Sequence, residues 1–337
     1  MLKKCKDKLL TSNPDLLTIK AGYKGNPVAN ERYLNYEKVL APKFKDILRW
    51  KTSRNPQSVE KRSDDFRLDT INDPRLFDRS LDKIVWLGHA SFLITMNGRS
   101  ILLDPVFGDI PLIKRRAPIP FAMKEYLFID YILISHAHYD HLDKKTVINL
   151  ARLNPQLKIY CGLGTAKLLK QKWKLTNKVI EAGWYQQFPI SDDSLEIYFM
   201  PALHWSNRSL RDRNLRLWGS FIIKGSSSTI YFMGDSGYSG HFREIGGFFP
   251  NIDYALLGVG AYMPRNIMQY SHINPDEAKQ AYRDLGAKYL LPMHYATYNL
   301  TDEPYGEPIQ KIRELFDGSN SLCEVEIGKV VELIISS

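Results

Sequence analysis

Four side chains that bind transition metals lie within six residues of one another: His136, His138, Asp140 and His141. Neutral imidazole and carboxylate suit a borderline metal such as Zn²⁺. In a loop that leaves a strand, His136 and His138 point the same way and can hold one ion. Asp140 and His141 turn toward the following segment and can reach a second ion. The spacing predicts a metal centre with two positions rather than an exposed polar loop.

Three further metal-binding side chains, His204, Asp235 and His294, each follow a short apolar run. Functional groups in sheet proteins often sit just beyond the ends of strands. Each of the three, taken alone, is more often a structural polar residue than a ligand. Together with the cluster at 136–141, they complete the ligand set of a two-ion site.

The elements expected around these residues are mostly short strands. Residues 91–96 and 100–103 flank Asn97-Gly98, a strong hairpin signal. Residues 129–134 form a nearly continuous apolar run, typical of a strand buried on both faces. A helix is expected over 144–153, and another begins after Asn274 as N-cap. Further strands are expected at 83–88, 158–161, 195–199, 219–223, 229–232, 254–257 and 289–292. The pattern predicts two packed sheets with helices outside, an α/β (α+β) fold.

The first 80 or so residues differ in composition from the rest of the chain. Residues 1–80 are polar and charged and contain five prolines. We interpret them as an extension packed on a main body formed by residues 81–337. The three cysteines, Cys5, Cys161 and Cys323, are widely spaced, which favours reduced thiols and a cytoplasmic location. The sequence has no run of about 18 apolar residues, so no membrane-spanning helix is expected.

The formal net charge is +9 and the pI is about 9.2, which suits an anionic partner as well as a surface rich in lysine. No nucleic-acid-binding motif is found, so no nucleic-acid partner is expected. The loop 110–121 is both apolar and basic, with Lys114, Arg115 and Arg116 in series. It predicts a peripheral membrane contact, with a packed loop carrying a solvated basic turn as the alternative. The oligomeric state, including a homo-oligomer, is left open.

Beyond single residues, whole segments resemble a known family. The chain resembles the metallo-β-lactamase superfamily and, within it, the N-acyl-phosphatidylethanolamine phospholipase D branch, from about residue 25 to residue 307. The segments that carry this resemblance are 86–92, 104–105, 136–143, 204–206, 217–221, 234–238, 260–262, 272–275 and 301–304. The histidine motif is specific to the superfamily, and the other segments are specific to the branch.

The resemblance implies a four-layer αββα sandwich and two Zn²⁺ ions per chain, although other divalent transition metals suit similar ligands. It implies a hydroxide held between the ions and a phosphodiesterase of the phospholipase D type that hydrolyses N-acyl-phosphatidylethanolamine-like phospholipids. The implied ligands are His136, His138 and His204 for one ion, Asp140, His141 and His294 for the other, and Asp235 between both.

Two alternative functions are kept. The same site could hydrolyse a soluble phosphodiester or a lactone, as other members of the superfamily do. A non-enzymatic binding module for membranes or nucleic acid is supported by the basic charge alone.

Several other residues are assigned roles around the site. Asp140 and His272 are the expected catalytic residues, with His272 near the reacting phosphate; a capping or packing role for His272 is the alternative. Tyr262 and Arg265 are expected to contact substrate. His89 and Asp104 are expected to support the ligands without binding the metal directly, and His241 is expected to be exposed. Met263 and Ser271 depart from the residues that the family commonly carries, which puts the identity of the substrate in question.

Overall fold

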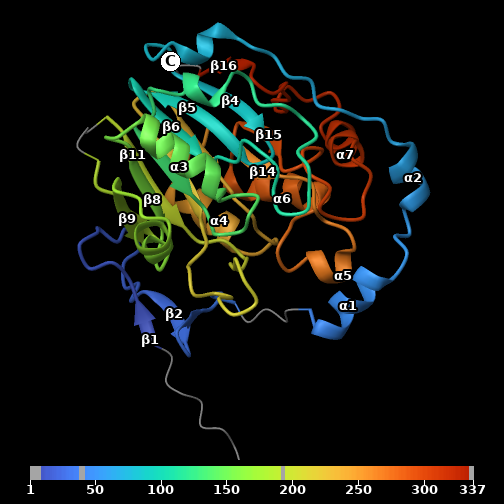
Figure 1. The fold of residues 1–337 in the computed structure, drawn as a ribbon, viewed down its shortest axis with the longest axis horizontal. Helices are drawn as coiled ribbons and strands as arrows, with labels where there is room; N and C mark the ends of the chain where they lie inside the picture. The colour runs from blue at the N-terminus through green and yellow to red at the C-terminus, as the bar shows by residue number, and fades with distance from the viewer. Residues whose placement is uncertain (1–8, 38–41, 191–193, 334–337) are drawn as a thin grey trace, which may run out of the picture.

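A computed structural model describes residues 9–37, 42–190 and 194–333 of the 337-residue chain, so Cys5 lies outside the described residues. Two sheets form its centre (Figure 1). The larger sheet contains, in spatial order, β16 (Val330–Glu332), β4 (Lys83–Gly88), β5 (Ser91–Met96), β6 (Arg99–Leu103), β7 (Tyr131–Ile134), β8 (Lys158–Gly162) and β9 (Lys178–Ala182). The smaller contains β10 (Gln186–Gln187), β11 (Glu196–Met200), β12 (Ser220–Lys224), β13 (Thr229–Phe232), β14 (Tyr254–Gly258) and β15 (Tyr289–Met293).

Both sheets are mixed. In the larger sheet β16, β4, β5 and β6 are antiparallel neighbours, whereas β6 to β9 run parallel. The smaller sheet is antiparallel from β10 to β13 and parallel from β13 to β15. The expected hairpin is confirmed: β5 and β6 pair around Asn97 and Gly98, whose φ angles are 51° and 70°. Positive φ at both central residues is what a tight hairpin of this kind requires.

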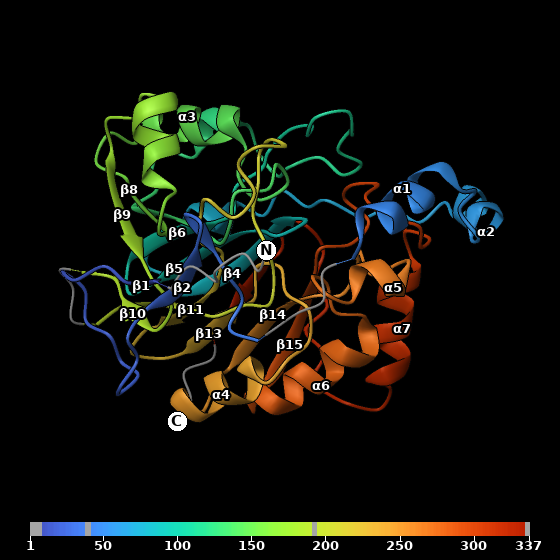
Figure 2. The same cartoon turned by 90° about the horizontal axis from the view of Figure 1, so that it is seen from below.

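Helices cover the outer faces of the two sheets, as Figure 2 shows. On one side lies α3 (Lys144–Leu153), and on the other lie α4 (His241–Phe248) and α6 (Pro275–Leu285). Strands β4, β5 and β7 of the larger sheet are buried on both faces because alternate residues enter different cores. Val85 and Leu93 pack in the cluster that includes α3, whereas Ile84 and Ile94 pack in the core between the sheets. The fold is therefore the αββα sandwich that was expected.

The predicted helices begin where their capping residues place them. In α3 the Asp143 side chain accepts a hydrogen bond from the backbone N–H of Thr146 at 2.8 Å. In α6 Asn274 and Glu277 form a reciprocal capping box, with Pro275 at the first helical position. The expectations of a helix over 144–153 and of an N-cap at Asn274 are both confirmed. Two further helices of the main body are α5 (Arg265–Met268) and α7 (Glu307–Leu315). One-turn helices lie at Pro74–Phe77 and Met123–Glu125, and a π-helical turn lies at Lys167–Lys172.

The N-terminal segment contains a small sheet of β1 (Leu9–Thr11), β2 (Asn26–Ala29) and β3 (Arg32–Tyr33), followed by α1 (Phe44–Thr52) and α2 (Ser58–Ser63). It contacts the sandwich at two distant places. The Ile19 N–H donates to the Tyr185 carbonyl at 2.9 Å, and the Trp50 indole donates to Asp302 Oδ2 at 2.8 Å. Among the described residues, no helix has both the length and the apolar character needed to cross a membrane.

Two details differ from expectation. His241, the first residue of α4, is buried rather than exposed. Its ring nitrogens lie 2.7 Å from Ser239 Oγ and 3.2 Å from Ser236 Oγ. In the loop 110–121, Arg115 points into the protein and donates to the carbonyls of Val106 and Ala117. The basic series is therefore only partly directed at solvent.

Candidate metal centre

The candidate ligands gather where strands of both sheets end. His136 and His138 follow β7, His204 follows β11, Asp235 follows β13 and His294 follows β15. The backbone at this edge is unusual, because Asp104 and His294 have φ angles of 37° and 64°. The left-handed region costs a non-glycine residue roughly 1–2 kcal/mol. The sandwich therefore holds these side chains in a conformation that local preference alone would not select.

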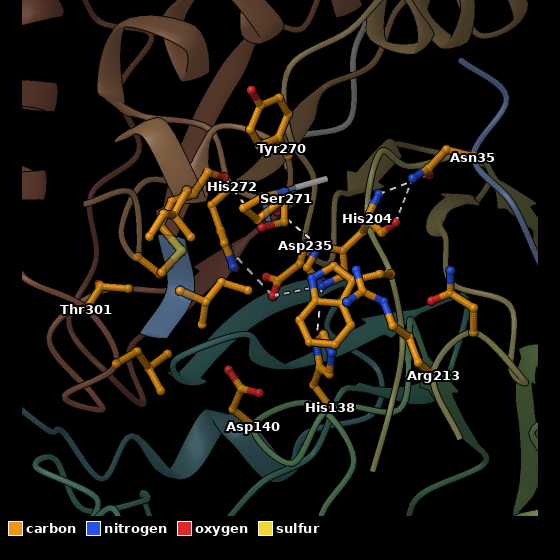
Figure 3. Close-up of a pocket in the computed structure, with 18 of the residues that line it drawn as sticks. Asn35, His138, Asp140, His204, Arg213, Asp235, Tyr270, Ser271, His272 and Thr301 are labelled. Carbon is orange, nitrogen blue, oxygen red and sulfur yellow. Dashed lines mark hydrogen bonds and ion pairs between the residues drawn. The ribbon is translucent and has the colours of Figure 1, made fainter. Parts of the chain in front are cut away.

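One half of the centre consists of His136, His138, His204 and Asp235, whose ligand atoms all lie within 4.8 Å of one another. His138 Nδ1 is 2.8 Å from His136 Nε2 and 3.2 Å from His204 Nε2. Asp235 Oδ2 is 3.7 Å from the Nε2 atoms of both His136 and His204. Figure 3 shows His138, His204 and Asp235 directed at one another from separate loops.

The other half consists of Asp140, His141 and His294, again facing Asp235. The Nε2 atoms of His141 and His294 are 3.3 Å apart, and each is 3.1 Å from an Asp235 carboxylate oxygen. Asp140 Oδ2 is 3.6 Å from His294 Nε2 and 3.7 Å from His141 Nε2. Asp235 is thus the one carboxylate shared by both halves.

Hydrogen-bond partners of Nδ1 leave the Nε2 atoms of His141 and His204 free to bind a cation. His141 Nδ1 lies 2.7 Å from Asp104 Oδ2, and His204 Nδ1 lies 3.0 Å from the Ser271 carbonyl oxygen. Each acceptor fixes the proton on Nδ1, so the Nε2 lone pair points into the centre. Converging lone pairs and carboxylate oxygens form a donor set that a divalent cation fits.

Burial and the two carboxylates set the charges of the centre. Burial holds the pKa of His136 well below its usual value, and the neighbouring histidines act in the same direction. Burial also lowers the pKa of His138, to about 4. For His294 burial is outweighed by Asp235 and Asp140, which raise the pKa to about 9. The first half therefore offers neutral imidazoles, whereas in the second half Asp235 and Asp140 favour the protonated form of His294.

His89 lies beside the centre and contacts one of the candidate ligands, Asp140. It is 1% exposed, and its Nε2 is 3.1 Å from Asp140 Oδ2. Its ring centroid is 3.9 Å from that of His294. His89, Asp140, His141 and His294 together form a second group whose atoms could hold an ion. The direct contact with Asp140 means that His89 can orient this carboxylate.

The centre opens into a cavity of about 850 Å³. His138, Asp140, His204, Asp235 and His272 line it, and the His272 Nδ1 is 3.9 Å from Asp235 Oδ2. The structure thus places His272 on the side of the centre that faces the cavity. Much of the remaining wall is apolar, and its apolar members include Leu34, Ile47, Trp50, Ile110, Ile267, Met268 and Leu300.

Tyr262 and Arg265, the expected substrate contacts, do not line this cavity. The Tyr262 hydroxyl donates to Glu307 and the ring is buried. Arg265 forms a two-pronged ion pair with Glu277, at 2.8 and 2.9 Å, and donates to the His272 carbonyl. Tyr262 therefore connects its loop to Glu307, and Arg265 connects α5 to α6 and to the segment before it. Neither side chain faces the cavity.

Three further residues lie around the candidate ligands. Asn35, from the N-terminal segment, hydrogen bonds both to the His204 carbonyl at 2.9 Å and to the His204 N–H at 3.3 Å. Trp205 packs edge-on to His138, with ring centroids 4.4 Å apart. Arg213 lies over Trp205, 4.6 Å from the ring centroid, and lines the cavity. Trp205 directly follows a candidate ligand in the sequence and is expected in the core or the wall of the site, where the structure places it. Asn35 and Arg213 have no such signal and were missed.

Comparison with known proteins agrees with this architecture. Residues 99–295 match the family described as the beta-lactamase superfamily domain. The fold resembles the metallo hydrolase Igni18 of Ignicoccus hospitalis, with a TM-score of 0.57 and 24% identity over 74% of this chain and 97% of that one. It also resembles the metallo-beta-lactamase fold protein YhfI of Bacillus subtilis, with a TM-score of 0.53 and 20% identity over 74% and 99% of the two chains. The chain belongs to the beta-lactamase superfamily, and fold and site together define a metal-dependent hydrolase of that class.

Within the superfamily, the similarity extends to one branch. The chain is 34% identical over 265 residues to the N-acyl-phosphatidylethanolamine-hydrolyzing phospholipase D 1 of Caenorhabditis elegans, covering 73% of this chain and 74% of that protein. It is 33% identical over 260 residues to the mitochondrial enzyme of the same description from Saccharomyces cerevisiae. That match covers 72% of this chain and 54% of the yeast protein.

Proposed function

We propose that this protein hydrolyses the phosphodiester of N-acyl-phosphatidylethanolamine-like phospholipids, in the manner of a phospholipase D. The observation that carries the proposal is the union of a two-part His/Asp centre and a largely apolar cavity of about 850 Å³ in one site. The centre suits a phosphodiester, and the apolar wall suits acyl chains. The similarity to two phospholipases of this specificity supports the assignment.

In this proposal the centre holds two Zn²⁺ ions, with other divalent transition metals as substitutes. His136, His138 and His204 would hold one, Asp140, His141 and His294 the other, and Asp235 would contact both. Bound there, the metal would activate water and neutralise charge on the phosphoryl oxygens. His89 and Asp104 would act as positioning residues, through their contacts with Asp140 and His141 respectively.

The side chains of the cavity then place the substrate for attack. The oxygen of water forms a bond to phosphorus, the bond from phosphorus to the ethanolamine oxygen breaks, and that oxygen takes up a proton. The products are phosphatidic acid and an N-acylethanolamine. His272 faces the cavity beside Asp235, so its imidazole can hydrogen bond a phosphoryl oxygen or deliver the proton to the leaving oxygen.

A peripheral membrane contact belongs to the same proposal. Leu112 and Leu210 are fully exposed, and Leu48 on α1 is half exposed. Ile110, Pro111 and Ile47, close to these residues in the sequence, line the cavity. Apolar tips near a cavity entrance would let a lipid pass from a bilayer without crossing water. Because Arg115 and Arg116 are engaged within the protein, Lys114 is the basic residue of this loop that would face the lipid.

The test is product analysis with metal-loaded protein and N-acyl-phosphatidylethanolamine in mixed micelles. Phosphatidic acid and N-acylethanolamine should form in equal amounts, and His138→Ala and Asp235→Asn should each reduce the rate at least about a hundredfold. Arg211→Gln, an exposed change outside the cavity wall, is the matched control. If wild-type protein released neither product, or if His138→Ala released as much as wild type, the proposal would be wrong.

A substrate panel separates this function from hydrolysis of a soluble phosphodiester or a lactone by the same centre. The apolar wall predicts that shortening the acyl chains raises KM, whereas a site for a soluble substrate would prefer the water-soluble members of the panel. Faster turnover of a soluble phosphodiester or a lactone than of any lipid would assign the alternative function.

A further inference from the structure

A second cavity, of about 400 Å³, lies between α2, the loop around Arg116 and the loop that follows β15. Four cationic side chains line it: Lys61, Arg62, Arg67 and Arg116. We call it the cationic pocket. The only carboxylate among its lining residues is that of Asp64. None of the residues that line it belongs to the centre described above, so its charges need a separate explanation.

Arg116 is the most constrained of the four cations. Its guanidinium carbon lies 3.3 Å from the centroid of the Tyr305 ring, and Nη2 donates to the Phe66 carbonyl at 3.1 Å. Its Nε is buried and has no hydrogen-bond partner among the described residues. The ring of Tyr305 and the Phe66 carbonyl thus hold the planar guanidinium in the wall of the pocket, where its charge can act on an anion.

The carboxylate of the pocket is hydrogen bonded to backbone groups and forms no ion pair with its cations. Asp64 accepts hydrogen bonds from the N–H groups of Phe66 and Gly306 through its two oxygens, at 2.9 and 2.8 Å. Within the described ranges, none of the four cations forms an ion pair with a carboxylate. Burial lowers the pKa of Arg116 and the nearby Arg67 acts in the same direction, whereas Tyr305 and Asp64 oppose them. Like charges are therefore held together at a cost that an anion would relieve.

We infer that the cationic pocket binds the phosphate group of a phosphomonoester or phosphodiester, at a site separate from the metal centre. Planar guanidinium groups match the oxygens of phosphate in geometry as well as charge. The site could be filled by a lipid headgroup or by a soluble phosphate compound, since both present the same group.

The pocket also has a route to the metal centre. Lys61, one of its four cations, donates from Nζ to the Thr301 carbonyl, and Thr301 lines the cavity of the centre. The Thr301 hydroxyl in turn donates to Glu303, which accepts the N–H groups of Ala261 and Met263. An anion that draws Lys61 toward the pocket would act on this loop. Occupancy should therefore change the rate at the centre as well as the stability.

Calorimetric titration of the metal-loaded protein with inorganic phosphate tests the inference. Phosphate can also bind a metal centre, so Asp235→Asn serves to remove that contribution while keeping the pocket. Binding should persist in Asp235→Asn and should weaken about tenfold or more in the double variant Arg62→Gln/Arg67→Gln. These two side chains are exposed, so the double variant should fold, which circular dichroism would verify. The control is Lys144→Gln/Arg152→Gln, two exposed cations on α3.

Sedimentation with phosphatidic acid vesicles, with phosphatidylcholine vesicles as reference, identifies the source of the phosphate. Loss of vesicle binding in the double variant points to a lipid headgroup, and loss of phosphate binding alone points to a soluble compound. Arg116→Lys keeps the charge and removes the planar fork, so binding should fall in this variant as well. Equal binding of phosphate and of vesicles by wild type and the double variant, or no binding by either, would overturn the inference whatever the substrate of the centre.

Discussion

The proton positions of two buried histidines are fixed by partners that are not candidate ligands themselves. His141 is held by Asp104, and His204 by the carbonyl oxygen of Ser271. The ligand types at 136–141 were predictable because their spacing alone suggests a metal. The distant partners were predictable only as polar residues after strands. The orienting contacts of Asn35 and Ser271 were not, since a backbone carbonyl or a loop amide leaves no pattern in a sequence.

Asp104→Asn should weaken metal binding by about 10- to 100-fold, because the amide is a poorer acceptor for His141 Nδ1 and must also serve Ser135. Competition with a chromophoric chelator measures this affinity. Asp143→Asn is a suitable control, since asparagine caps a helix as well as aspartate does. Unchanged affinity in Asp104→Asn would show that Asp104 does not position the ligand.

Arg213→Gln should raise KM for an anionic lipid substrate several-fold and change kcat little. Arg213 lines the cavity and lies over Trp205, so its charge can meet a phosphate before reaction without touching the metal ligands. Steady-state kinetics at low and high salt measure the effect, which salt should diminish. Arg211→Gln, two residues away, is the control, and a fall in kcat alone would contradict the interpretation.

The elements of the sandwich were largely predictable, whereas the role of the N-terminal segment was not. Strands such as β5 and β6, and the helix α3, carry their own hydrophobic patterns and turn residues. Asn35 lies in a segment without periodicity, and its contacts with His204 join residues 169 positions apart. A contact at that separation depends on the finished fold. The same is true of Ile47 and Trp50 in the cavity wall.

Asn35→Ala should therefore impair the centre from outside the sandwich. The substitution leaves the His204 N–H and carbonyl without their partner and should lower the free energy of unfolding by about 1–3 kcal/mol. Urea denaturation followed by circular dichroism measures this change, and the rate of hydrolysis should fall with it. Asn207→Ala, which removes only a 3.5 Å contact with Ser209, should have little effect. Equal stability of the two variants would argue against a role of Asn35 in holding the His204 backbone.

Lys83 on β4 makes stability depend on pH. Its ammonium donates to the Asp78 and Leu81 carbonyls, and burial lowers its pKa from 10.5 to about 8. Between these values the unfolded chain binds more protons than the native one, so the free energy of unfolding increases as pH rises through this window. Lys83→Met should show a smaller increase from pH 8 to pH 10 in urea titrations. Parallel curves for the two proteins would refute this assignment.

At the scale of the whole molecule, the metal centre joins the two sheets. Its ligands follow β7 in the larger sheet and β11, β13 and β15 in the smaller, and the N-terminal segment closes over the same edge. Neither sheet carries a complete site. Assembly of the sandwich and formation of the centre are therefore coupled, and binding free energy at the centre should stabilise the fold as a whole.

Removal of the metal should consequently lower the Tm of the entire protein. A ligand present at a hundred times its Kd adds about 2.7 kcal/mol to the native state, which for a chain of this size corresponds to a shift of about 4 °C. Differential scanning calorimetry before and after chelation measures the shift, and added Zn²⁺ should restore it. Asp235→Asn should have a lower Tm that responds little to either treatment, because the carboxylate shared by both halves is gone. A chelator-induced shift as large in Asp235→Asn as in wild type would place the stabilising metal elsewhere.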